Sequence, residues 1–254
     1  ILASIGDQGT LIIDSMYAPI IPKVQSEIAG LGGDEIDFVI STHFHFDHTD
    51  GNPILARSGS SIISHTNARR SMVAERPINM VNIAFLQTPY PKDTLPVITF
   101  DDEMQFHFND ETLDLLHVAP AHTSGDIVIY LRHSNLIHMG DVFNNDGYPF
   151  LDTDNGGDID GMIEFCKSVL SNINEDTRII PGHGPIMSYQ ELVNHISMLE
   201  TVRDRIGRLI DTGNSLEEVI AAQPTSEYDL HYGQHQTIAS DPVIFINRIY
   251  MNLT

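Results

Sequence analysis

The stretch that most constrains this chain is "DFVISTHFHFDH", residues 37–48, in which a short apolar run ends in a cluster of titratable side chains. Alternate side chains of an extended chain point to the same face. His43 and His45 therefore project together, while Phe44 and Phe46 project into the body of the protein. The pattern predicts a buried strand that ends at the edge of a sheet and presents two imidazoles there.

Two more ligand-type side chains, Asp47 and His48, follow directly, and a helix is expected to begin near residues 49–50. Neutral imidazole is the commonest metal ligand among side chains, and zinc favours nitrogen, sulfur and carboxylate donors. A histidine-rich surface loop without a metal is the alternative interpretation. The regular His-x-His-x-Asp-His spacing directly after a buried strand disfavours that alternative, so we predict a metal site.

A metal needs three or four ligands, and three later stretches offer the missing ones. "APAHTSGD" presents His122, "LIHMGDVF" presents Asp141, and "IIPGHGP" presents His183. Each residue lies in a turn beside an expected strand, where a rigid sheet can aim side chains at a common point. One histidine at a strand end is more often structural, so the prediction depends on the three stretches together.

Seven residues are thus candidate ligands of two metals. The first site would be formed by His43, His45 and His122. The second would be formed by Asp47, His48 and His183, with Asp141 as the bridge between the two sites.

These motifs closely resemble the metallo-β-lactamase superfamily. The matching stretches are "HFHFDH" at 43–48, "AHTSGD" at 121–126, "GD" at 140–141 and "PGHGP" at 181–185. The resemblance runs from about residue 8 to residue 186. It implies an α/β fold, the four-layer αββα sandwich, with a dinuclear zinc site at one edge of the two sheets.

The resemblance has departures that concern the substrate. The best-known subclass of β-lactamases has cysteine where this chain has Asp141, and a lysine three residues later where this chain has Asn144. The aspartate is similar to that of the glyoxalase II and nuclease branches, where it bridges both metals. The chain lacks the basic glutathione-binding residues of the former and the basic surface of the latter. It therefore looks like a divergent branch, close to members with weak β-lactam activity.

The predicted function is a hydrolase with two zinc ions, in which a metal-bound hydroxide attacks the carbonyl of a small amide or ester, cyclic β-lactams included. Asp47 is the predicted catalytic residue, because it can orient the hydroxide and pass its proton on. A thioesterase or lactonase is the alternative, and an iron-dependent sulfur dioxygenase is a further one. Asn144, Tyr148 and Phe150 follow Asp141 closely and are candidate substrate contacts.

Charge restricts the partners. The chain has 35 Asp plus Glu against 13 Lys plus Arg, a formal net charge of −22. Nucleic acids and anionic membranes need a basic face, so neither is an expected partner. No apolar run approaches the roughly 20 residues of a membrane span. A small-molecule substrate is the expected partner, and the oligomeric state is open.

The ends of the chain leave two questions open. The sequence begins directly with a strand-like stretch, so we expect a preceding segment, and either the cytoplasm or the periplasm fits a soluble protein of this kind. We expect a single domain over residues 1–254, with a core over residues 1–186 and a mostly helical extension over residues 187–254.

Pattern and turn residues predict the elements of that domain. Strands are expected at 1–5, 10–14, 37–41, 61–65, 97–100, 103–108, 112–118, 127–131, 135–139 and 177–181. Helices are expected at 18–32, after the histidine cluster, from residue 66, at 159–171 and beyond residue 188. Residues 76–96 and 144–160 are expected to form long loops. The single cysteine, Cys166, falls on the apolar face of the helix at 159–171 and is expected to be a buried structural thiol.

Overall fold

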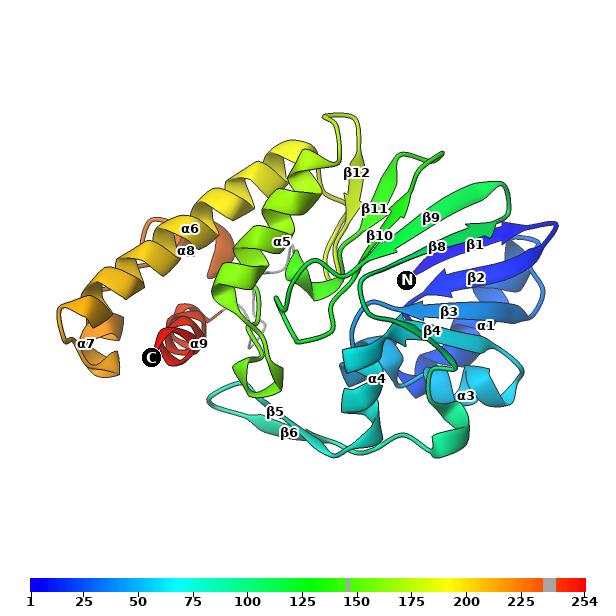
Figure 1. The fold of residues 1–254 in the computed structure, drawn as a ribbon, viewed down its shortest axis with the longest axis horizontal. Coiled ribbons are helices and arrows are strands. Elements are labelled where there is room, and N and C mark those ends of the chain that lie inside the picture. The colour runs from blue at the N-terminus through cyan, green and yellow to red at the C-terminus, as the bar shows by residue number, and fades with distance from the viewer. Residues whose placement is uncertain (145–146, 235–240) are drawn as a thin grey trace. The chain divides into compact units, whose positions relative to one another are not determined.

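The computed structural model describes residues 1–144, 147–234 and 241–254 (Figure 1). The chain forms two compact units, the first of residues 1–76, 86–117 and 125–134, and the second of residues 77–85, 118–124 and 135–254. No helix of the described ranges is long and apolar enough to cross a membrane.

The first unit contains a five-stranded sheet in the order β1-β2-β3-β4-β7. Its strands are β1 (Leu2–Gly6), β2 (Gly9–Ile13), β3 (Ile36–Ser41), β4 (Ser61–His65) and β7 (Ile98–Phe100). β1 and β2 form an antiparallel hairpin, and the other pairs are parallel. The strands predicted at 1–5 and 10–14 and the strand that leads into the histidine cluster are confirmed.

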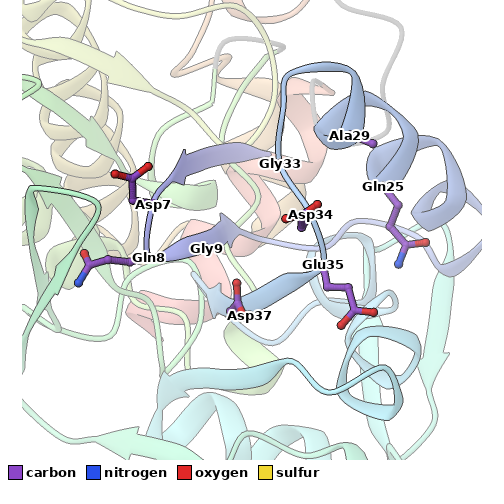
Figure 2. Close-up of a pocket in the computed structure, with 9 residues that line it drawn as sticks. All are labelled: Asp7, Gln8, Gly9, Gln25, Ala29, Gly33, Asp34, Glu35 and Asp37. Carbon is purple, nitrogen blue, oxygen red and sulfur yellow. The ribbon is translucent and has the colours of Figure 1, made fainter.

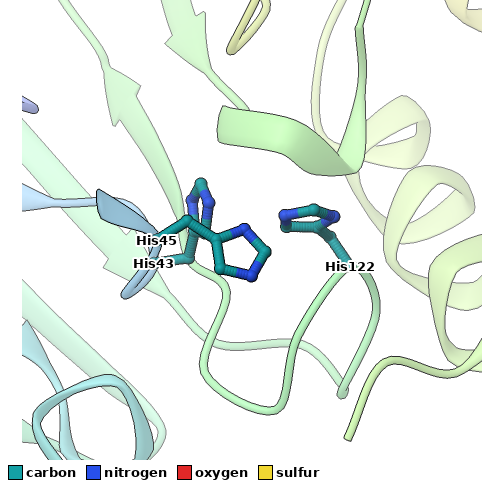
Figure 3. A group of neighbouring side chains, drawn as sticks. All are labelled: His43, His45 and His122. Atoms are coloured by element: carbon teal, nitrogen blue, oxygen red, sulfur yellow. The ribbon is translucent and has the colours of Figure 1, made fainter. Parts of the chain in front are cut away.

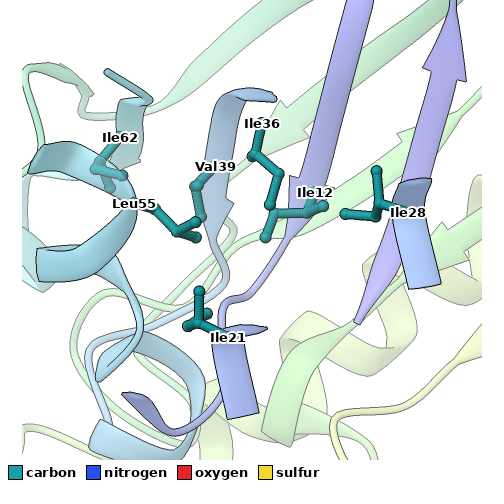
Figure 4. Packing of buried hydrophobic residues seen from close by; sticks show 7 residues of the cluster. All are labelled: Ile12, Ile21, Ile28, Ile36, Val39, Leu55 and Ile62. Carbon is teal, nitrogen blue, oxygen red and sulfur yellow. The ribbon is translucent and has the colours of Figure 1, made fainter. Parts of the chain in front are cut away.

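Short helices follow the strands of this sheet. They are η1 (Ala18–Ile20), α1 (Ile21–Gly30), α2 (Phe46–Thr49), α3 (Asn52–Arg57), α4 (Thr66–Val73) and η2 (Lys92–Thr94). Proline stands in the first turn of α1 and of α3, where the missing N–H has no helical partner to lose. Figure 4 shows the apolar cluster that the helices bury against β2, β3 and β4: Ile12, Ile21, Ile28, Ile36, Val39, Leu55 and Ile62.

A second five-stranded sheet has the order β12-β11-β10-β9-β8. In the first unit it contributes the antiparallel strands β8 (Glu103–Phe108), β9 (Glu111–Leu116) and β10 (Val128–Leu131). Phe38 of β3 packs against Phe106 and Phe108 of β8, with ring centroids 5.0 and 5.4 Å apart. The two sheets of this unit therefore meet through interlocked aromatic side chains.

The second unit combines two parallel strands, β11 (Leu136–His138) and β12 (Arg178–Ile180), with most of the helices. The helices are η3 (Gly140–Val142), η4 (Thr153–Asn155), α5 (Ile159–Ser171), α6 (Tyr189–Asp211), α7 (Leu216–Ala221), α8 (Asp229–Tyr232) and α9 (Pro242–Leu253). The long helix α6 runs beside α5 (Figure 1). The predicted helical C-terminal region is confirmed.

One predicted loop is wrong. Within residues 76–96 the chain forms a two-stranded sheet from β5 (Arg76–Asn79) and β6 (Ala84–Gln87). The Asn79 side chain accepts a hydrogen bond from the Val81 N–H, which stabilises the turn. Val81 itself takes a positive φ of 63°, a conformation that is unfavourable for a β-branched residue. Proline content suggested a loop, but Pro77 is compatible with a strand that has an open edge. The described part of the other loop, 144–160, contains the short η4 and ends in the first residues of α5.

Candidate metal centre

The described residues contain two groups of histidine and aspartate side chains that could hold a metal ion. They are His43, His45 and His122 in one group, and Asp47, His48, Asp141 and His183 in the other. Within each group, one ligand-type atom of every residue lies within 4.8 Å of the others. Figure 3 shows the three imidazoles of the first group. The members of these two groups are the seven residues that the sequence predicts as ligands, and their role as ligands stays a prediction.

The end of β3 sets the direction of the first two histidines. Phe44 is buried against Ala68, Met72 and Leu95, as the alternating pattern predicts. Phe46 packs on Tyr17, with ring centroids 5.9 Å apart. Because both phenylalanines are packed on one side of the chain, the imidazoles of His43 and His45 are fixed on the other side.

Asp14, at the end of β2, holds two of the histidines and is a residue that the sequence reasoning missed. Its carboxylate accepts hydrogen bonds from the Thr42 N–H (2.8 Å), the Thr42 hydroxyl (2.9 Å) and Nδ1 of His48 (2.8 Å). The Thr42 hydroxyl in turn lies 3.0 Å from Nδ1 of His43. Since that hydroxyl already donates to Asp14, it accepts a hydrogen bond from Nδ1 of His43.

This network fixes the tautomer of both imidazoles. With Nδ1 of His43 and of His48 as the donor, Nε2 is the nitrogen that each ring offers to a metal. Asp14 also adopts a positive φ of 61°, a conformation in which aspartate and asparagine are more common than most residues. The signal in the sequence is "IIDS", an aspartate directly after an apolar strand that neighbours the strand of the histidines.

His122 is oriented in the same way by a different group. Its Nδ1 lies 2.6 Å from the backbone carbonyl oxygen of Phe150, which can only accept, so Nε2 again faces outward as the ligand nitrogen. The ring is buried, with 1 % of its surface exposed. No sequence pattern pointed to this carbonyl, because 28 residues separate the two partners.

Asp141 stands in η3, and the shape of the neighbouring glycine turn depends on it. Its Oδ2 lies 3.3 Å from Nε2 of His183 and 3.9 Å from Nε2 of His122. A Cβ atom at Gly182 would come within 1.9 Å of the Asp141 carboxylate. Only glycine therefore fits before His183, which explains the first glycine of "PGHGP".

The three candidate substrate contacts are all buried. The Asn144 side chain accepts a hydrogen bond from the His183 N–H (3.1 Å), and the Phe150 ring lies 5.8 Å from the ring of His122. The Tyr148 hydroxyl donates to Asp229 (2.8 Å), and burial raises the pKa of Tyr148 strongly. Each of these residues thus supports the protein itself, and contact with a substrate stays a prediction for all of them.

A separate hollow of about 750 Å³ lies at the other end of β2 and β3, as Figure 2 shows. Its lining includes Asp7, Asp34, Glu35 and Asp37. Among the residues that the structure describes, these carboxylates form no group comparable with the two above.

The donor set fits a metal of borderline hardness. Imidazole nitrogens and carboxylate oxygens suit zinc, and also iron, copper and nickel. The one thiol takes no part, because Cys166 is fully buried in α5 and burial raises its pKa to about 12. This agrees with the predicted structural role of Cys166.

Known proteins match both the sequence and the fold. The chain is 23 % identical over 180 residues to a probable metallo-hydrolase of Methanocaldococcus jannaschii, covering 69 % of this chain and 83 % of that protein. It superposes on a metallo-β-lactamase from Pontibacter korlensis with a TM-score of 0.63 and 16 % identity, covering 78 % of this chain and 85 % of that one.

The helical C-terminal region is also found in a known fold. A sec-alkylsulfatase from a Pseudomonas species matches 98 % of this chain, at a TM-score of 0.74 and 13 % identity, with 46 % of its own length covered. The model of the metallo-β-lactamase superfamily matches residues 1–193, which include all seven candidate ligands. The chain therefore belongs to the metallo-β-lactamase superfamily and has its α/β fold.

Proposed function

We propose that this protein is a hydrolase that uses two zinc ions to cleave a small amide or ester, cyclic β-lactams included. The observation that carries the proposal is the position of the Asp141 carboxylate. Its Oδ2 approaches Nε2 of His183 and Nε2 of His122, which belong to different ligand groups. A carboxylate so placed is suited to bridge two metals. Two similar proteins, each named as a probable metallo-hydrolase, support the same reaction class.

Different residues of this chain would hold the two metal ions. His43, His45 and His122 would hold one ion, Asp47, His48 and His183 the other, and Asp141 both. Two bound zinc ions would lower the pKa of a water molecule to about 7 and polarise a carbonyl group. The histidine tautomers are set in advance for this purpose by Asp14 and by the Phe150 carbonyl.

Asp47 is the proposed proton-transfer residue. Its Oδ2 lies 3.5 Å from Nε2 of His48, which places the carboxylate among the ligands, and 19 % of its side chain is exposed. A carboxylate in this position can orient the attacking water, take up its proton and pass that proton to the leaving group. No serine or cysteine nucleophile is required.

The substrate is proposed to be small and to bind through the metals rather than through basic side chains. Asn144 stands where the best-known β-lactamases have lysine, and the net charge of −22 disfavours highly anionic ligands and nucleic acid. A thioester or a lactone is the second candidate, favoured by the aspartate at position 141. The full set of ligands for a second metal argues against an iron dioxygenase with a single ion.

Metal analysis combined with a substrate panel tests the proposal. Protein purified without added metal should contain about two zinc ions per chain, whereas one iron would contradict the proposal. The panel consists of a chromogenic cephalosporin, a simple ester, a glutathione thioester, a lactone and a phosphodiester. Turnover of the cephalosporin or the ester supports the first candidate, and turnover of the thioester or lactone alone favours the second.

A further inference from the structure

A loop of residues 147–158, here called the support loop, is hydrogen-bonded to residues 121–124, the segment that carries His122. Four hydrogen bonds connect them: His122 Nδ1 to the Phe150 carbonyl (2.6 Å), the Asp152 N–H to the His122 carbonyl (3.0 Å), the Ser124 N–H to the Asn155 carbonyl (3.0 Å), and the Asp158 N–H to the Ala121 carbonyl (2.8 Å). The direction of the His122 ring therefore depends on the support loop.

The support loop is in turn held by one face of α9. Residues three, four and seven apart lie on one side of a helix, and Phe245, Arg248 and Asn252 have this spacing. The ring of Phe245 stacks on Tyr148 at 4.7 Å. At the other end, the Asn252 amide donates to the Gly157 carbonyl and to the Asp158 carboxylate, both at 3.4 Å. Contacts thus extend along the whole length of the loop.

Arg248 makes the central contact. Its Nη1 donates to the Thr153 hydroxyl (3.0 Å) and to the Asp154 carboxylate (3.1 Å). Its guanidinium carbon lies 5.7 Å from the centre of the Phe150 ring. Arg248 therefore contacts the very residue whose carbonyl orients His122.

The burial of Arg248 indicates more than packing. Only 4 % of this residue is exposed, and a buried charge is costly unless it is paired. An apolar residue would fill the same space on α9 without that cost. A guanidinium held between Asp154 and the Phe150 ring instead fixes the conformation of the support loop through directional contacts.

We propose that α9 holds the support loop in the conformation that orients His122, and that Arg248 is a positioning residue for this ligand. The inference rests on the proposed metal-dependent function and assigns a role to the C-terminal end of the chain. Loss of the Arg248 contacts lets the Phe150 carbonyl move, which loosens the Nδ1 hydrogen bond of His122. Zinc then binds more weakly at the site to which His122 contributes.

The test compares Arg248→Met, which keeps the unbranched apolar stem of the side chain but removes the guanidinium, with Arg248→Lys and with the control Arg205→Met. Arg205 also makes two hydrogen bonds in the C-terminal helical region, to the Pro224 carbonyl and to Glu227, but none to the support loop. Zinc dissociation constants are measured by chelator competition. The Nδ1–H resonance of His122 is followed by NMR in the intact chain.

Arg248→Met should weaken one of the two zinc sites about 10- to 100-fold, the range found when support of a ligand is lost. The His122 Nδ1–H should exchange faster with water. Arg248→Lys should restore part of the affinity, because an ammonium can still pair with Asp154. Arg205→Met should match the wild type. If Arg248→Met does not fold, Asn252→Ala is expected to give a smaller shift in the same direction.

The possible outcomes separate this inference from the proposed function. The positioning role of Arg248 is overturned if Arg248→Met has the same zinc affinity and the same His122 exchange as the wild type and Arg205→Met. Where Asn252→Ala replaces Arg248→Met, the same comparison applies to it. Two zinc ions in the wild type would still uphold the proposed function. If Arg248→Met and Arg205→Met weaken zinc binding equally, the effect is one of general stability, and the positioning role of Arg248 is also overturned. A wild-type chain that binds no zinc would refute both.

Discussion

The two sets of candidate ligands are built in different ways. The strand set, His43, His45, Asp47 and His48, comes from one continuous stretch at the end of β3. The loop set, His122, Asp141 and His183, comes from three turns that are far apart in the sequence. A short continuous stretch needs little chain ordering to bring its ligands together, whereas separate turns depend on long-range contacts.

The support of the two sets differs accordingly. The strand set is braced by Asp14 and Thr42, which directly follow β2 and β3, two adjacent strands of a single sheet. The loop set is braced by backbone groups, such as the Phe150 carbonyl, and by a glycine that makes room for Asp141. We infer that the strand set is pre-formed and that the loop set is the part more easily lost by mutation.

The strongest test of this difference removes a ligand of the loop set. His122→Ala should abolish turnover and release the metal of the three-histidine site, since two imidazoles remain there. Metal that binds only the folded state stabilises it, so the melting temperature should also fall. Metal content, rate and thermal unfolding are measured together. Full metal content and an unchanged rate would show that His122 is not a ligand.

The second test addresses the proton-transfer role within the strand set. Asp47→Asn keeps the shape and one oxygen donor but removes the charge and the basicity. With zinc in excess to fill both sites, kcat should fall about 10²- to 10⁴-fold, the usual effect of losing a positioned proton-transfer group. KM should change little. A near-normal kcat across neutral pH would reduce Asp47 to a metal ligand alone.

The third test removes the brace of the strand set. Asp14→Asn tolerates the positive φ, so backbone strain is not the cause of any effect. The amide cannot match the carboxylate as acceptor for His48 and Thr42, and zinc affinity should fall about 10- to 100-fold. Asp37→Asn, which loses one hydrogen bond from the Thr10 N–H in the same sheet, is the control. An equal fall in both variants would contradict the brace.

The ligands were predictable from the sequence for a physical reason, and their supports were not. A ligand set needs particular side-chain types in turns beside strands, and both leave local signals, as in "HFHFDH" and "PGHGP". The strand within "TRIIP" and the helix at 159–171 were likewise found from local patterns.

Support depends on which segments meet in space. The carbonyl that orients His122 and the arginine that contacts Phe150 are set by pairings across 28 and 94 or more positions, which no local pattern encodes. The β5–β6 hairpin was missed because Pro77 is compatible with both a loop and an open strand edge.

The smallest predicted effect concerns acid sensitivity on the side of the loop set. His195 of α6 lies fully buried, 4.8 Å from the ring of Phe143, just beyond the turn of Asp141. Burial lowers its pKa from 6.5 to about 3, while the Val142 carbonyl opposes the shift less strongly. The folded chain keeps this ring neutral, whereas the unfolded chain protonates it below pH 6.5. Stability from this group is therefore complete above pH 6.5 and declines as the pH falls toward 3, by about 2 kcal/mol at pH 5.

His195→Leu should reduce the fall in unfolding free energy between pH 7 and pH 5 by that amount, in urea titrations with chelator present. The exposed His107→Gln should not change it. Parallel curves for His195→Leu and the wild type would place the acid sensitivity in other groups.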